Sequence, residues 1–268
     1  MPRPGLIFFS DLDGTLLDHH SYDWTPAAPA LERLRRHRLP LVLNSSKTAP
    51  EIRALRRELG NEDPFIVENG AAVVIPADYF EPGPEQTLNM DCSRSRVLAV
   101  LRELRLQGFS FTGFSDLSVT ELSRVTGLDE AGAALALDRS GTEPLMWQGT
   151  GRDLETFRAA LAEAGLNLVE GGRFLHVMGL FDKADGMRYL MSLYARARPG
   201  PTLLSIALGD SPNDLPMLAG ADLAVVISGV NSDAVELPDG HAVMRSVELG
   251  PAGWNQCVQD ILSRYDYD

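Results

Sequence analysis

The fold of this chain is decided near its start by the stretch LIFFSDLDGTL, residues 6–16. Its first four residues are an apolar run of the kind that a parallel sheet buries on both faces. Because residues two apart in an extended segment point to the same side, Asp11 and Asp13 are expected to converge where this strand ends. Open α/β sheets bind ligands at that carboxyl edge. The stretch therefore predicts a site at the end of the first strand.

Two neighbouring carboxylates at this place repel each other unless a cation lies between them. Hard oxygen ligands select Mg²⁺, so we expect a magnesium site that includes Asp11 and Asp13. Gly14 allows the chain to turn away after them, and Thr15 is expected to fix the turn with a local hydrogen bond. The alternative is a pair of solvated loop aspartates, which the complete pattern directly after a buried strand disfavours.

Strands and helices alternate on both sides of a central segment. In the first part, strands are expected at residues 6–9, 39–43 and 65–67, and helices at 26–38 and 48–60. In the last part, helices are expected at 184–195 and 214–219, and strands at 203–208, 223–227 and 242–244. Repeated strand–helix units of this size predict an α/β fold built on a parallel sheet.

The central segment has a different rhythm. It follows the loop-forming sequence EPGPE at residues 81–85, and helices are expected at 95–106, 119–125, 130–137 and 153–164. Strands are expected at 109–114, 144–147, 166–170 and 173–178, the last two joined as a hairpin by Gly171-Gly172. We therefore expect an α/β core, residues 1–82 and 181–268, interrupted by an α+β insert at residues 83–180.

The composition limits the partners of this protein. Its 268 residues carry 24 Lys and Arg against 37 Asp and Glu, which gives a formal net charge of −13. A net acidic surface repels phosphate backbones, so nucleic-acid binding is not expected, whereas a small anionic substrate needs only a local positive site. The apolar runs are too short for a signal peptide or a membrane span. Cys92 and Cys257 have neither disulfide nor zinc spacing, and we expect a cytoplasmic protein without membrane partners.

A second acidic segment, GDSPND at residues 209–214, follows an expected apolar strand. Asp210 lies at the end of that strand, where a third carboxylate favours metal ligation. Asp214 lies at the start of the next helix, where the helix dipole stabilises a negative charge. For Asp214, ligation of the metal and a plain role as helix N-cap both stay open.

The chain has two lysines, and both follow core segments. Lys47 lies in NSSKT, residues 44–48, after the second strand, and Lys183 lies at the start of the next core helix. A phosphorylated substrate beside acidic groups needs compensating positive charge, and a compact ammonium group supplies it in a way that arginine does not. Ser45 offers a hydroxyl to a phosphate oxygen. The alternatives are solvated surface lysines and an ordinary helix-initiating serine.

Taken in order, these segments resemble the four motifs of the haloacid dehalogenase-like (HAD) phosphohydrolases. The motifs are Asp11-x-Asp13-Gly-Thr, Ser45, Lys183 and Asp210-x-x-x-Asp214. The resemblance implies a HAD-like Rossmannoid core with a parallel sheet and an inserted α+β cap domain. A closer resemblance, to the mannosyl-3-phosphoglycerate phosphatases within that superfamily, rests on NSSKT (44–48), VENGA (67–71), RSGTEP (139–144) and GGRFLH (171–176).

The resemblance implies a Mg²⁺-dependent phosphatase that acts through an aspartyl-phosphate. Asp11 would attack phosphorus, and Asp13 would act as general acid and then as general base. The phosphoryl oxygens would be held by Ser45, Ser46 and Lys183. The metal would be held by Asp11, Asp13, Asp210 and Asp214, the last either directly or by supporting the other ligands.

The insert is expected to supply specificity, because a glycosyl-3-phosphoglycerate has a sugar and a carboxylate besides its phosphate. The candidate substrate contacts are Glu68, Asn69, Arg139, Ser140, Thr142, Arg173 and His176, with Glu143 for sugar hydroxyls. Ordinary surface or hairpin side chains are the alternative for the residues of the insert. The resemblance places the reaction in mannosylglycerate biosynthesis, and we expect a monomer or a homodimer.

Other functions stay open at this point. Another HAD sugar-phosphate phosphatase, or a phosphosugar mutase that resembles phosphomannomutase, would use the same core motifs. A non-catalytic module that binds phosphorylated ligands would be expected to lack the nucleophile, and the presence of Asp11, Asp13, Lys183 and Asp210 disfavours it. Mannosyl and glucosyl esters differ at one hydroxyl, so both stay candidate substrates.

Overall fold

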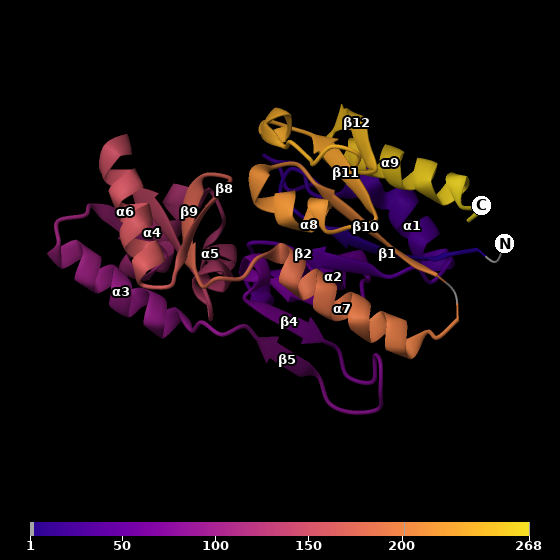
Figure 1. Ribbon diagram of the computed structural model, residues 1–268, viewed down its shortest axis with the longest axis horizontal. Coiled ribbons are helices and arrows are strands. Elements are labelled where there is room, and N and C mark those ends of the chain that lie inside the picture. The colour runs from indigo at the N-terminus through magenta and orange to yellow at the C-terminus, as the bar shows by residue number, and fades with distance from the viewer. Residues whose placement is uncertain (1–2, 201, 268) are drawn as a thin grey trace.

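Two β-sheets organise the computed structural model, which describes residues 3–200 and 202–267 (Figure 1). The strands of the larger sheet are, in spatial order, β12 (Val243–Leu249), β11 (Leu223–Ser228), β10 (Leu203–Gly209), β1 (Gly5–Ser10), β2 (Leu41–Asn44), β3 (Phe65–Val67), β4 (Ala72–Ile75) and β5 (Gln86–Asn89). Neighbouring strands from β12 to β3 are parallel, whereas β4 and β5 extend the sheet in antiparallel fashion. The predicted α/β fold with a parallel-rich sheet is confirmed.

Helices cover both faces of the larger sheet (Figure 1). One face packs against α1 (Ala28–Arg36), α2 (Ala49–Leu59) and α9 (Gly250–Arg264), and the other against α7 (Lys183–Ala197) and α8 (Leu215–Ala219). Because the strands are covered on both faces, β1 is a continuous apolar run. None of the helices in the two described ranges combines the length and the apolar composition that a membrane span needs.

The helix expected at residues 48–60 is α2, and both of its ends are set by local hydrogen bonds and conformation. Thr48 and Glu51 form a capping box, in which each side chain accepts a hydrogen bond from the N–H of the other residue. Gly60 ends the helix in the left-handed conformation, with φ 61°. Residues 45–47 are therefore held as a short loop between β2 and α2, at the carboxyl edge of the sheet.

The smaller sheet lies beside the carboxyl edge of the larger one, away from both chain ends (Figure 1). Its antiparallel strands are, in spatial order, β6 (Phe111–Gly113), β7 (Glu143–Trp147), β9 (Phe174–Met178) and β8 (Asn167–Gly171). The helices of this part are α3 (Arg94–Leu106), α4 (Val119–Thr126), α5 (Glu130–Leu137) and α6 (Gly151–Glu163). The predicted hairpin is present, with Gly172 at φ 56° in the turn between β8 and β9.

Two strands of the larger sheet, β4 and β5, and one helix packed on it, α9, were not predicted. The side chains of β5 are all exposed, so its strand conformation comes from pairing with β4 and leaves no alternation in the sequence. This pairing also places residues 86–89 in the larger sheet, although the insert was expected to start at residue 83. The division into a core and an insert at residues 83–180 otherwise stays a prediction.

Candidate active site

Lys183 joins two carboxylates at the carboxyl edge of the larger sheet. Asp182 caps α7 through the N–H groups of the first turn and thereby fixes Lys183 at the start of the helix. The Lys183 Nζ lies 2.5 Å from Asp11 Oδ1 and 2.6 Å from Asp214 Oδ1, and all three side chains are buried. Burial lowers the pKa of Lys183, but the charges of Asp11 and Asp214 outweigh it and hold that pKa above its ordinary value. The lysine is a fixed cation between two acids.

A third carboxylate completes an acidic cluster. Asp11, Asp210 and Asp214 offer oxygen atoms that all lie within 4.8 Å of one another. Burial and the charge of Asp214 raise the pKa of Asp210 to about 7, and the same two causes raise the pKa of Asp11 well above its ordinary value. One ammonium group does not neutralise three carboxylates. Because the donors are all oxygen atoms, the cluster fits a hard divalent cation such as Mg²⁺.

The side chain of Asp214 makes no N-cap hydrogen bond to α8, so the plain N-cap role is wrong, and its ligation of a metal stays a prediction. Its Oδ2 accepts hydrogen bonds from the N–H groups of Asp210 (3.1 Å) and Ser211 (3.2 Å), which closes the turn before α8. Its Oδ1 contacts Lys183 and belongs to the acidic cluster. The turn therefore aims one oxygen of this side chain at the site.

The turn after β1 lies against Asp210. Gly14 has φ 84°, and a Cβ on it would lie 2.6 Å from Asp210 Oδ2, so this position needs glycine for its conformation and for space. The prediction that the Thr15 side chain makes a local hydrogen bond is wrong. Its hydroxyl donates to Asp210 Oδ1 at 2.9 Å instead. The N–H of Thr15, which donates to Leu12 O, closes the turn instead. The first motif thus orients the third carboxylate.

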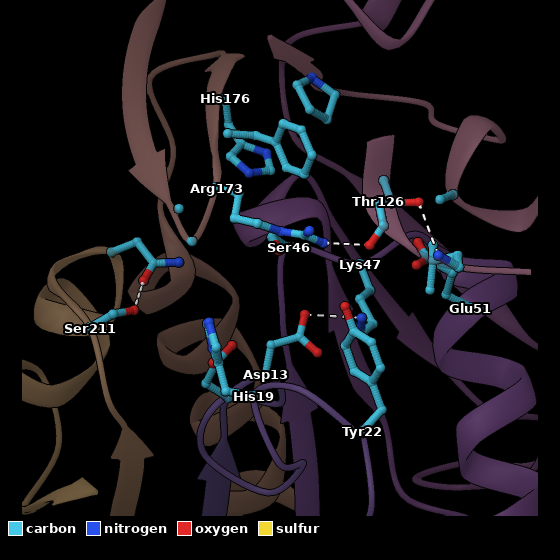
Figure 2. A pocket seen from close by; sticks show the side chains of 18 of the residues that line it. Asp13, His19, Tyr22, Ser46, Lys47, Glu51, Thr126, Arg173, His176 and Ser211 are labelled. Atoms are coloured by element: carbon cyan, nitrogen blue, oxygen red, sulfur yellow. Dashed lines mark hydrogen bonds and ion pairs between the residues drawn. The ribbon is translucent and has the colours of Figure 1, made fainter. Parts of the chain in front are cut away.

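Asp13 and Lys47 form a second ion pair, which faces the cavity described below (Figure 2). The Lys47 Nζ lies 2.9 Å from Asp13 Oδ2 and 4.9 Å from the centre of the Tyr22 ring. Burial lowers the pKa of Lys47, but the charges of Asp13 and Glu51 raise it above its ordinary value. The Asp13 Oδ1 is buried without a hydrogen-bond partner among the described residues. Lys47 is therefore part of the site and not a solvated surface lysine.

The cavity between the two sheets brings core and insert residues together. Asp13, Lys47 and Tyr22 of the core face Arg173 and His176 of the β8–β9 hairpin across it (Figure 2). The sequence candidates that line the cavity are Asp11, Asp13, Ser46, Lys47, Arg139, Arg173, His176 and Asp210. Its volume is about 140 Å³, below the roughly 300 Å³ at which typical ligand pockets begin. The two parts thus leave only a small cavity between them.

Comparison with known proteins agrees with this geometry. Residues 8–122 match the family model described as haloacid dehalogenase-like hydrolase. The chain is 36% identical over 279 residues to the glucosyl-3-phosphoglycerate/mannosyl-3-phosphoglycerate phosphatase of Methanococcoides burtonii, covering 96% of this chain and 97% of the relative. This chain belongs to the haloacid dehalogenase-like hydrolases. The match identifies it as a phosphoric monoester hydrolase.

Solved structures of the same fold cover the whole of this HAD hydrolase. A protein from Thermoplasma acidophilum matches with a TM-score of 0.69 and 18% identity, over 99% of this chain and 100% of that one. The sucrose-phosphatase of Synechocystis sp. PCC6803, solved with sucrose and phosphate, matches with a TM-score of 0.66 and 14% identity, over 98% of each chain. At these identities the likeness shows the fold.

Several residues that were expected to contact the substrate do not line this cavity. Glu68, Ser140 and Thr142 contact one another below the cavity, where the insert meets the core. Glu143 is buried in the insert, with its carboxylate held by Arg94 and by the N–H of Ser115. These carboxylates are therefore occupied by protein donors.

Asn69 and His176 carry polar atoms that are buried without a partner in the described part of the chain. For Asn69 these are both side-chain amide atoms, and the residue lines a neighbouring cavity together with Lys183 and Asn213. For His176 the atom is Nδ1. Burial, with the charge of Arg139 added, lowers the pKa of His176 to about 3, so its imidazole is neutral at physiological pH. The unpartnered Nδ1 of a neutral imidazole can donate or accept one hydrogen bond, according to the tautomer.

The sequence reasoning missed part of the cavity wall. His19 and Tyr22 come from DHHSYD, residues 18–23, a loop that directly follows the first motif. Its aromatic and polar composition beside Asp13 was the available signal. Asn213, which lies in the second acidic segment, and Thr126 also line the cavity. Thr126 belongs to the insert and reaches the cavity through the packing of the insert on the core.

Proposed function

We propose that this HAD phosphatase hydrolyses a glycosyl-3-phosphoglycerate, with the mannosyl ester as its main substrate and the glucosyl ester as a second one. The name of the Methanococcoides burtonii relative gives both esters, and its 36% identity extends over nearly the whole chain. The observation that carries the proposal is a cavity lined by Asp11, Asp13 and Lys47 of the core and by Arg139, Arg173 and His176 of the insert, with Lys183 buried beside Asp11. Such a set suits a ligand with a phosphate, a carboxylate and hydroxyl groups.

The proposed reaction begins at Asp11. Its carboxylate attacks phosphorus, the bond from phosphorus to the glycerate oxygen breaks, and an aspartyl-phosphate forms. Asp13 gives a proton to the leaving oxygen and then takes one from the water that attacks the aspartyl-phosphate. That attack releases phosphate and regenerates Asp11. The buried position of Asp11 and the place of Asp13 on the cavity wall support this division of roles.

Positive charge around the phosphoryl group would lower the barrier. Lys183, with Ser45 and Ser46, would hold the phosphoryl oxygens, and its two short ion pairs keep it in place. We expect Mg²⁺ to be held by Asp11, Asp210 and Asp214, with Asp13 contributing. When bound, the metal would supply charge compensation for the phosphoryl group.

The insert would select the rest of the substrate. Arg173 reaches the cavity while its Nη2 donates to Thr126 O at 2.6 Å, so the guanidinium is fixed and keeps other donors for a carboxylate. The neutral imidazole of His176 would form a hydrogen bond with a sugar hydroxyl. Arg139 lies at the edge of the phosphate-binding loop and is already engaged by Ser46 O.

A panel of phosphate esters tests the function. Phosphate release is measured with Mg²⁺ for mannosyl- and glucosyl-3-phosphoglycerate, sucrose-6-phosphate and mannose-6-phosphate. The glycosyl-3-phosphoglycerates should give the highest kcat/KM, and a preference for either of the other esters would overturn the substrate. A phosphorylated sugar isomer that accumulates without free phosphate would show a mutase.

The nucleophile is tested in the same assay. Asp11→Asn should reduce phosphate release by at least about 1,000-fold, because an amide does not form the aspartyl-phosphate. Asp260→Asn, on the exposed side of α9, is the matched control and should retain wild-type rates. An Asp11→Asn variant with full activity would remove Asp11 from the mechanism.

A further inference from the structure

The turn Glu68–Gly70 has a backbone that few sequences adopt. Its three residues have φ values of 51°, 58° and 103°, in the region that favours glycine, although the first two carry side chains. The Glu68 N–H donates to Lys47 O and the Asn69 N–H to Ser45 O, both at 2.9 Å. The turn is thereby anchored under the loop that carries the proposed phosphate ligands.

The side chain of Glu68 binds the insert. Its carboxylate accepts hydrogen bonds from the N–H groups of Ser140 (2.7 Å), Gly141 (3.1 Å) and Thr142 (2.9 Å). It also accepts from the hydroxyls of Ser140 (3.0 Å) and Thr142 (2.8 Å). A Cβ on Gly141 would lie 2.6 Å from Ala71 Cβ, so the insert approaches the core here as closely as glycine allows. One buried carboxylate thus takes five hydrogen bonds from one loop.

Arg139 links this loop back to the core. Its Nη2 donates to Ser46 O at 2.8 Å, and its Nε lies 3.6 Å from Glu68 Oε2. Its Nε and Nη2 also donate to Thr142 Oγ1. We call Glu68 together with residues 139–142 the joint. Through the joint, hydrogen bonds connect the insert with the turn Glu68–Gly70 and with the loop after β2.

The chemistry of the joint suits a contact that opens and closes. Burial raises the pKa of Glu68, but Arg139 and the hydrogen bonds outweigh it and hold that pKa below its ordinary value, so the carboxylate is ionised. Apolar side chains at a permanent interface are often at least as stable as a buried ion pair. An ionised carboxylate, in contrast, is readily hydrated when the two parts separate. The cavity of about 140 Å³ is smaller than typical ligand pockets, so a separation of the two parts would ease the entry of a glycosyl ester.

We propose that Glu68 is a positioning residue that clamps the insert closed over the substrate through the joint, and thereby sets the preference for large phosphate esters over small ones. Closure would bring Arg173 and His176 onto the sugar and the carboxylate and hold Arg139 on the phosphate-binding loop. A small ester needs only the core groups. The choice of the large ester rests on the proposed function.

Glu68→Gln tests the clamp, because it keeps the shape but turns an N–H donor toward the N–H groups of the insert. Amide hydrogen exchange of residues 140–142 should become at least about tenfold faster than in the wild type, since hydrogen bonds to a charged group are lost. The kcat/KM for mannosyl-3-phosphoglycerate should fall at least about tenfold, whereas that for p-nitrophenyl phosphate should change less than about threefold. Glu85→Gln, which breaks the exposed pair with Arg53, is the control and should change neither.

Unchanged exchange at residues 140–142, or an equal loss for both esters, would overturn the proposal. Thr142→Val removes one hydroxyl of the joint and keeps the buried charge. It should shift both readouts in the same direction but less, and it decides the question if Glu68→Gln does not fold. If the wild type cleaves p-nitrophenyl phosphate but no glycosyl ester, the proposed function fails, while the exchange of residues 140–142 still decides the clamp.

Discussion

Replacement of Asp210 by Asn is expected to stabilise the protein in the absence of metal and to remove its activity. Asp210 is buried beside Asp11 and Asp214, and burial with the charge of Asp214 raises its pKa from 3.8 to about 7. Asparagine has nearly the same shape and still accepts the hydrogen bond of Thr15, but it carries no charge. The substitution therefore removes repulsion without leaving a void.

The magnitude follows from the pKa difference. The rise of this pKa from 3.8 to about 7 corresponds to at most about 4 kcal/mol, at 1.36 kcal/mol per pH unit. The folded chain binds this proton more tightly than the unfolded chain does. The contribution of this proton to the free energy of unfolding is therefore fully present below pH 3.8, and it is lost as the pH rises through about 7. The advantage of Asp210→Asn should grow from near zero at pH 4 to a few kcal/mol at pH 8.

Urea unfolding followed by circular dichroism, between pH 4 and pH 8 with a chelator, measures this difference. Excess Mg²⁺ should then stabilise the wild type more than Asp210→Asn, because a ligand that binds only the folded state raises stability. Phosphate release should fall at least about 100-fold in the variant. Asp260→Asn, which lies on an exposed helix surface, should match the wild type throughout. A variant no more stable than the wild type at pH 8, or equally stabilised by Mg²⁺, would refute the reasoning.

Gly14→Ala should raise the Mg²⁺ concentration needed for half-maximal activity and cost at least about 1 kcal/mol in stability, because its Cβ would lie 2.6 Å from Asp210 Oδ2 at φ 84°. A magnesium titration checks this, and an unchanged titration would contradict it. Tyr79→Phe should lose about 1.5–3 kcal/mol in urea unfolding at pH 7, since its hydroxyl donates at 2.6 Å to Asp63, whose pKa is raised by burial. Its phosphatase kinetics should equal those of the wild type, because Asp63 precedes β3 at the opposite edge of the sheet; altered kinetics would show coupling between the edges.

The core of the site was predictable because its signals are local. Asp11 follows one apolar strand and Asp210 follows the neighbouring one, so the common edge of parallel strands brings these two carboxylates together. The expected convergence of Asp13 with Asp11 is not seen in this cluster, because the Asp13 carboxylate pairs with Lys47 instead. The same reasoning holds for α2, because the residues that determine each end of this helix lie at that end: Thr48 and Glu51 at its start and Gly60 at its C-cap. A pattern of a few neighbouring residues is enough in these cases.

The contacts of the insert were not predictable in the same way. The pairing of β5 with β4 and the packing of the joint depend on residues far apart in the chain. Glu68 illustrates the difference. Its place after the third strand indicated a site residue, but which group its carboxylate meets was decided by a loop more than 70 residues away. The prediction for the Thr15 hydroxyl was wrong for the same reason, because its acceptor is 195 residues away in the chain.

In the proposed mechanism, the two lysines would allow a chain with net charge −13 to hold a phosphoryl group. Each ammonium lies beside one of the two carboxylates of the first motif, Lys183 at Asp11 and Lys47 at Asp13. Lys183 bonds at once to Asp11 and to Asp214, two carboxylates on different elements, which three rotatable donors on one atom allow. The planar fork of arginine is matched instead to two oxygens of a single carboxylate or phosphate. The chain uses arginine for nearly all of its positive charge, whereas its two lysines pair with the two aspartates of the first motif, and Lys183 is in addition shared with Asp214.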